Sequence, residues 1–115
     1  MLLPALVGFV QGAAAVQARG LRAESMVRFA GKWLDVIKAL LPVYAAEIDR
    51  GDYSDGASSV DLFLAGAAHD ADLAEEANVD TAWPAPLNDL LRRAAQAGHG
   101  PHSVSALTEM LRKGA

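Results

Sequence analysis

Residues 1–16 read MLLPALVGFVQGAAAV, and this stretch decides the fold prediction. Gln11 is the only polar side chain within it. A helix that is apolar on every side has to be buried on every side, and a domain of 115 residues has little mass with which to surround one. We therefore expect an all-α helical bundle that is built on a long apolar N-terminal helix and is intertwined with a partner chain.

The rest of the chain continues the helical pattern, and no segment alternates with the period of a strand. Apolar residues recur at three- and four-residue steps, Pro42 is expected to break or kink the second helix, and Gly20 and Asn78 are expected to end helices. Ser58 or Ser59 and later Ser103 are expected to cap helices. The sequence predicts a single domain over residues 1–115, with helices at about residues 3–19, 23–42, 43–49, 58–77, 87–97 and 103–111.

Composition and charge exclude several classes of function. The formal net charge is −4 and lysines and arginines form no cluster beyond adjacent pairs, so we expect no nucleic-acid partner. The apolar start is too short to span a membrane and lacks the basic lead of a signal peptide, so we expect no membrane association. The chain has no cysteines, which is typical of a reducing compartment, and a cytoplasmic location is predicted.

The candidate metal and calcium sites lack part of the ligand sets that such sites need. The acidic loop around Asp49, Asp52 and Asp55 lacks the bidentate glutamate that an EF-hand needs at its twelfth position, where Val60 stands. Two pairs of potential ligands, His69 with Asp72 and His99 with His102, each fall short of the three or four ligands that a metal site needs. We expect a solvated turn, surface polar residues and no bound metal.

The two tryptophans have more than one reading. Trp33 lies in the apolar stripe of the second helix, so core packing is the default prediction, and lining a pocket is the alternative. Trp83 is expected to anchor a connector. The sequence contains no glycine-rich phosphate loop, nucleophile elbow or paired carboxylates, so no catalytic residues are predicted.

Several segments resemble the C-terminal region of imine reductases and reductive aminases, NADPH-dependent enzymes related to β-hydroxyacid dehydrogenases. The resemblance covers essentially the whole chain, and its most specific pieces are GDY at residues 51–53, ANVDTAWP at residues 77–84 and AGHG at residues 97–100. It also includes FVQGAAAVQARGL at residues 9–21, FAGKWL at residues 29–34, EIDRGDYSDGASSVDLFLAGAAHDADLAEEANVDTAWP at residues 47–84 and LLRRAAQAGHGPHSVSALTEMLRK at residues 90–113.

The resemblance implies an architecture and a site. In this family a Rossmann domain binds NADPH, and a long helix leads into a helical domain that intertwines with its partner's in a homodimer. Trp33 matches a tryptophan of the substrate cleft, and Leu62 and Phe63 fall where other cleft side chains stand. The usual proton donor would fall before Met1, and a second tyrosine or tryptophan of that helix aligns near Leu3, which cannot donate a proton.

Three functions follow from the resemblance as expectations. The first is the dimerisation and substrate-cleft domain of an imine-reductase-like oxidoreductase, with no cofactor in this chain and no hydride transfer alone. The second is one half of a split reductase, with a separate Rossmann chain as partner. The third is a stand-alone helical dimer whose cleft binds or transforms a hydrophobic amine or imine intermediate, with Asp61 or Asp70 as a general base.

Overall fold

The computed structural model describes residues 2–112, and all regular structure in this range is helical. The all-α prediction is confirmed. A single antiparallel β-bridge joins Ser59 to Ser103 in the described range. The elements are α1 (Leu2–Ala18), the 3₁₀ helix η1 (Ala23–Met26), α2 (Val27–Arg50), α3 (Val60–Glu76), α4 (Ala85–Ala94), the π-helical turn η2 (Ala95–His99), the 3₁₀ helix η3 (Val104–Ala106) and α5 (Leu107–Leu111).

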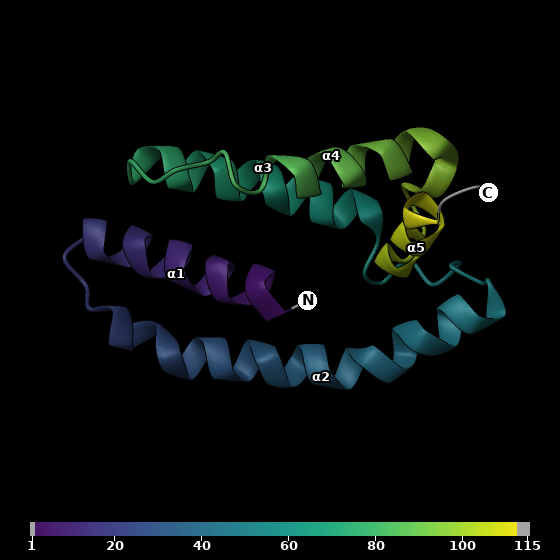
Figure 1. The fold of residues 1–115 in the computed structure, drawn as a ribbon, viewed down its shortest axis with the longest axis horizontal. Coiled ribbons are helices and arrows are strands. Elements are labelled where there is room, and N and C mark those ends of the chain that lie inside the picture. The colour runs from purple at the N-terminus through teal and green to yellow at the C-terminus, as the bar shows by residue number, and fades with distance from the viewer. Residues whose placement is uncertain (1, 113–115) are drawn as a thin grey trace.

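The helices form two layers with α1 between them (Figure 1). One layer is α2, which runs along the whole length of the molecule, and the other is the pair α3 and α4. Helix α5 lies at one end, close to where α2 ends and α3 begins. The molecule is elongated, with extents of 46 × 27 × 24 Å.

The N-terminal helix is not the long helix of the fold. Helix α1 covers 17 residues, whereas α2 covers 24 and is the longest element. None of the residues of α1 is buried. The prediction of a bundle built on a long apolar N-terminal helix is therefore wrong in that respect, and α2 has the role of the long frame. Intertwining with a partner chain stays a prediction.

Pro42 does not end a helix. Helix α2 continues through it to Arg50 and stops at Gly51, whose φ of 66° is left-handed. The prediction of a separate helix from Val43 is wrong, because a proline removes one backbone hydrogen bond and the turns on both sides can hold the helix together. The usual consequence is a bend, and the axis of α2 curves along its length in Figure 1.

The predicted caps are confirmed at three places. The amide of Leu62 donates to Ser59 Oγ at 3.1 Å at the start of α3, and the amide of Ser105 donates to Ser103 Oγ at 3.2 Å at the start of η3. Asn78 follows α3 with a left-handed φ of 56°. These residues satisfy or redirect backbone groups that a helix end leaves without partners.

The buried residues gather where α2 ends, α3 begins and residues 99–105 pass between them, a region we call the corner. Glu47 of α2 is only 4% exposed. Its Oε1 accepts hydrogen bonds from Ser103 Oγ and Ser105 Oγ, both at 2.7 Å. The amide of Ser103 donates to the carbonyl of Tyr53 at 2.8 Å. The corner therefore joins segments more than 50 residues apart in the chain through polar groups.

The apolar core is small. Within residues 2–112 the buried apolar side chains include more alanines than large residues. Small side chains bury little area each and contribute correspondingly little hydrophobic free energy. The buried apolar residues are Tyr53, Val60, Ala74, Ala94 and Ala106.

Over residues 2–112, no helix combines the length and the hydropathy that crossing a lipid bilayer requires.

Candidate functional site

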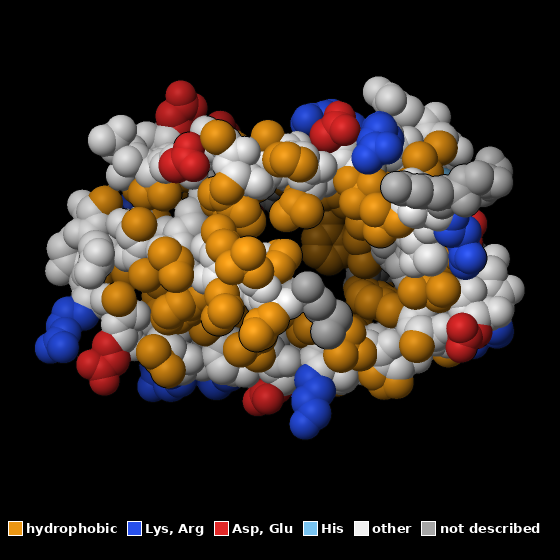
Figure 2. All heavy atoms as spheres, viewed as in Figure 1, with side chains coloured by type: hydrophobic (Ala, Val, Ile, Leu, Met, Phe, Trp, Pro, Cys, Tyr) orange, Lys and Arg blue, Asp and Glu red, His pale blue; other side chains and the backbone are white. Residues whose placement is uncertain are grey.

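The first candidate site is a hollow between α1 and α2, which we call the apolar groove. Its volume is about 520 Å³. Hydrocarbon side chains make up almost all of its wall, and Figure 2 shows hydrophobic side chains gathered over this face of the molecule. The residues that line it are Leu2, Ala5, Leu6, Phe9, Met26, Phe29, Ala30, Trp33, Leu34 and Ile37.

Trp33 lies in this groove and not in a core. Its side chain is 67% exposed, so the default prediction of core packing is wrong and the alternative, lining a pocket, describes its position. The apolar stripe of α2 marks a face that favours burial. The periodicity does not show whether the residues that cover this face belong to the same chain or to another one. Among the described residues, few contact Trp33, and its side chain stays largely exposed.

Leu62 and Phe63 stand apart from Trp33. They occupy the first turn of α3, in the layer opposite α2 (Figure 1). Their side chains are 58% and 45% exposed, and neither lines the apolar groove. The structure therefore presents the three predicted cleft residues as exposed apolar side chains on two surfaces, and whether they share one cleft stays a prediction.

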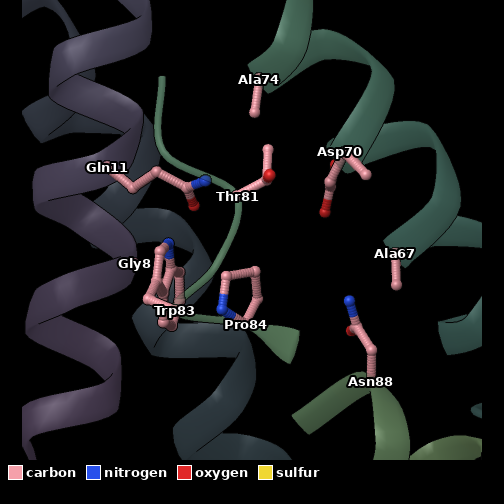
Figure 3. A pocket seen from close by; sticks show the side chains of 10 residues that line it. Gly8, Gln11, Ala67, Asp70, Ala74, Thr81, Trp83, Pro84 and Asn88 are labelled. Carbon is pink, nitrogen blue, oxygen red and sulfur yellow. The ribbon is translucent and has the colours of Figure 1, made fainter. Parts of the chain in front are cut away.

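The second candidate site is a smaller hollow of about 310 Å³, shown in Figure 3. We call it the polar hollow because four polar side chains join its apolar wall: Gln11, Asp70, Thr81 and Asn88. Helices α1, α3 and α4 and the connector before α4 supply its wall. Trp83 lies against α1, where its ring would be 4.0 Å from a Cβ placed on Gly8. Its Nε1 is buried and has no hydrogen-bond partner among residues 2–112. The labelled lining residues are Gly8, Gln11, Ala67, Asp70, Ala74, Thr81, Trp83, Pro84 and Asn88.

Neither hollow fits a dinucleotide cofactor. The pyrophosphate of NADPH is held by glycine-rich turns, helix N-termini or basic side chains. No lysine or arginine of residues 2–112 lines either hollow, and Asp70 would place a negative charge in the polar one. We therefore expect these two hollows to favour uncharged or cationic groups over phosphates.

The acidic loop binds its own backbone. Asp52 Oδ1 accepts the hydroxyl and the amide of Ser54 at 2.6 and 3.0 Å, and Asp55 Oδ1 accepts the amide of Ala57 at 3.1 Å. The Ser54 hydroxyl, followed by its amide, lowers the pKa of Asp52 below the ordinary 3.8. Across residues 2–112 no three histidine or acidic side chains come together around a common metal position.

Two polar clusters were not anticipated from the sequence. One is Glu47 with Ser103 and Ser105, described above. In the other, the Tyr53 hydroxyl donates to Glu109, which raises the pKa of Tyr53 and lowers the pKa of Glu109. The partners lie 56–58 residues apart, so no local sequence pattern predicts these contacts. The only signal in the sequence was Glu47, a charged residue at an inward position of α2.

The exposed surface is large for a chain of this size. A folded monomer of 12.0 kDa is expected to expose about 6,000 Å², whereas this chain exposes 8034 Å². Most of the large apolar side chains that are exposed within residues 2–112 lie on two helices. The large exposed apolar residues there are Leu2, Leu3, Leu6 and Val10 of α1 and Val27, Phe29, Trp33, Leu34, Val36, Ile37, Leu41 and Val43 of α2, which together we call the uncovered face.

Known proteins share both the sequence and the fold. Residues 1–113 match the family described as NADPH-dependent reductive aminase-like, C-terminal domain. The chain is 33% identical over 82 residues to the NADPH-dependent reductive aminase of Aspergillus oryzae, an alignment that covers 71% of this chain and 28% of that protein.

Solved structures give the same result. The reductive aminase of Aspergillus terreus, in complex with NADPH4, cyclohexanone and allyl amine, is similar with a TM-score of 0.85 and 27% identity, over 93% of this chain and 38% of that one. The imine reductase of Streptomyces aurantiacus is similar with a TM-score of 0.87 and 26% identity, over 96% and 38% of the two chains. The chain thus spans well under half the length of these relatives, and it belongs to the family of NADPH-dependent reductive aminase-like C-terminal domains.

Proposed function

We propose that this domain joins two subunits of an imine-reductase-like, NADPH-dependent oxidoreductase and supplies part of the substrate cleft. In this proposal two copies intertwine as a homodimer, with the uncovered face of each copy packed against the other. NADPH is held by a Rossmann domain, on the same polypeptide or on a separate one as in a split reductase. The domain alone does not transfer hydride.

The uncovered face is the observation that carries the dimerisation proposal. The surface in excess of a typical monomer is about 2,000 Å², and a standard interface buries about 800 Å² on each partner. Obligate homodimers bury more than this and have more apolar interfaces. Figure 2 also shows this face hollowed between the layers, beside the N-terminal end of α1, with hydrophobic side chains around the hollow.

Trp33, Leu62 and Phe63 are the proposed cleft residues. Their exposed apolar side chains would wall the site where an imine meets the cofactor. Bound NADPH would supply the hydride, and these side chains would exclude water and hold the hydrophobic part of the imine. Assembly of the two surfaces into one cleft would require the partner subunit, because in one chain Trp33 stands on α2 and the other two residues stand on α3, in the opposite layer.

The oligomeric state tests the dimerisation proposal. Light scattering after size exclusion, at micromolar concentration, should give about twice the 12.0 kDa of one chain. Leu6→Glu places a charge in the apolar groove and should produce a monomer, because burying an unpaired charge costs several kcal/mol. Leu111→Glu is the matched control on α5, away from the groove, and should remain a dimer. A wild-type monomer would overturn the proposal.

The groove volume favours a second candidate function, binding of a hydrophobic amine or imine by this domain itself. Small-molecule sites range over about 300–1,000 Å³, and the apolar groove, at about 520 Å³, lies within that range. A cyclic amine or imine that fills the groove should quench Trp33 fluorescence, and Trp33→Phe should abolish the response while Trp83→Phe keeps it. A dimer without any response to such ligands would favour the dimerisation role alone.

A further inference from the structure

We propose that His99 and His102 form a proton-sensitive clamp that holds the first turn of α3, and with it Leu62 and Phe63. The clamp itself follows from the geometry of the corner. Its consequence for a substrate cleft rests on the function proposed above for Leu62 and Phe63.

The two imidazole rings share one hydrogen bond. His99 Nδ1 lies 3.1 Å from His102 Nδ1, with the ring centroids 5.2 Å apart. One Nδ1 therefore carries a proton and the other accepts it through its lone pair. The contact survives when the pair is neutral or holds one positive charge. It does not survive a second added proton, because both Nδ1 atoms then carry hydrogens that face each other and the two rings repel.

The backbone of the same loop caps α3. The amide of Val60 donates to the carbonyl of His102 at 3.0 Å, and the amide of Asp61 donates to the carbonyl of Gly100 at 2.9 Å. The amide of His102 donates to the carbonyl of His99 at 3.0 Å, which closes the loop between the two rings. Movement of the ring pair therefore changes the acceptors that hold the residues immediately before Leu62 and Phe63.

Two carboxylates lie close to the histidine pair. The ring of Tyr53 meets His99 edge-on with centroids 6.2 Å apart, and Tyr53 is bonded to Glu109. The carboxylate of Asp61 lies against Gly100, within 2.7 Å of where a Cβ would stand. The other charged groups bonded to residues of this region are Glu47 of α2, through Ser103, and Arg112 of α5, through Glu109.

The direction of the effect follows from proton counting. In acid the unfolded chain binds one added proton on each of the two histidines. The closed clamp accepts only one added proton for the pair. Stability therefore rises with pH across the range in which histidines change charge. Binding of the second proton therefore opens the clamp.

Nuclear magnetic resonance of the full chain tests the clamp. The chain has three histidines, and His69 lies on α3, away from the corner, so His69→Asn provides the background in which only the pair titrates. In that background the protection of the Val60 and Asp61 amides should fall about tenfold between about pH 7.5 and pH 5, as the second proton binds. Protonation of the rings can be followed in the same samples through their nitrogen shifts.

His102→Asn, added to that background, removes the second charge and keeps a hydrogen-bonding group near the position of Nδ1. Protection at Val60 and Asp61 should then stay constant over the same range, and His99→Asn serves in the same way if the first variant does not fold. Equal pH dependence with and without the histidine pair would overturn the proposal. Because the readout is local to α3, a chain that is monomeric but pH-responsive would sink the dimerisation proposal and leave the clamp standing.

Discussion

Replacing Ser105 by alanine should destabilise the chain through the corner. The Ser105 hydroxyl donates to Glu47 Oε1 at 2.7 Å and lies 3.0 Å from Ser103 Oγ. Ser105→Ala removes one oxygen from a buried position and leaves the glutamate with a single hydroxyl donor. A hydrogen bond to a charged group contributes about 1.5–3 kcal/mol to the free energy of unfolding, and we expect a loss of that size.

The loss converts into a measurable shift of the melting temperature. With about 2.1 cal/mol/K of unfolding entropy per residue, a chain of 115 residues loses about 4 °C of Tm for each kcal/mol. Ser105→Ala should therefore melt about 6–12 °C below the wild type in calorimetry at one fixed protein concentration, since association would also shift Tm.

Ser54→Ala is the matched control. The Ser54 hydroxyl also donates to a carboxylate, Asp52 Oδ1 at 2.6 Å, but both residues are exposed. Water replaces the lost donor there, so the shift should be no more than about 2 °C. If Ser105→Ala and Ser54→Ala shifted Tm equally, the reasoning that burial makes the Glu47 cluster stabilising would be refuted.

Further predictions concern the glycines and the Tyr53–Glu109 pair. Gly56→Ala should cost about 1–3 kcal/mol in urea unfolding, because its Cβ would stand 2.7 Å from the carbonyl oxygen of Pro101. Gly66→Ala on α3 should gain up to about 1 kcal/mol, because a Cβ there would meet open space among the described residues. Because the Tyr53 hydroxyl lowers the pKa of Glu109, wild-type stability should fall as pH drops below the ordinary value of 4.5. Because Glu109 raises the pKa of Tyr53, the stability that the neutral phenol contributes should be lost as pH rises beyond the ordinary value of 10.0. Tyr53→Phe should weaken both pH dependences in thermal melts, and unchanged profiles would contradict the assignment.

Local features of the fold could be predicted from the sequence. Ser59 and Ser103 cap helices, and Asn78 ends one, because each acts through backbone groups within three residues of itself. The prediction that Pro42 separates two helices was wrong, because the helical turns on both sides of Pro42 hold α2 together. The prediction also took the N-terminal helix for the longest one, because residues 1–16 are the most apolar stretch. The longest helix is α2, whose residues are more mixed in polarity.

The candidate site was harder to predict, because it depends on distant residues. Periodicity placed Trp33 on an apolar face, but it could not show that so little of this chain covers that face. The bonds from Ser103 and Ser105 to Glu47 cross more than 50 residues of sequence, and no spacing rule connects them. The resemblance to a known family supplied Leu62 and Phe63, which local patterns alone would have left as ordinary helix residues.

The loose seating of α1 has a consequence for how the molecule assembles. Its link to η1 is the short segment 19–22, where Gly20 has a left-handed φ of 80°, and side-chain bonds to the other layer are few, such as Gln11 Nε2 to the carbonyl of Asp80 at 3.4 Å. A helix held so weakly opens at little cost in free energy. Its docking then becomes part of subunit association, so the rate at which its amide hydrogens exchange with solvent should fall as the protein is concentrated.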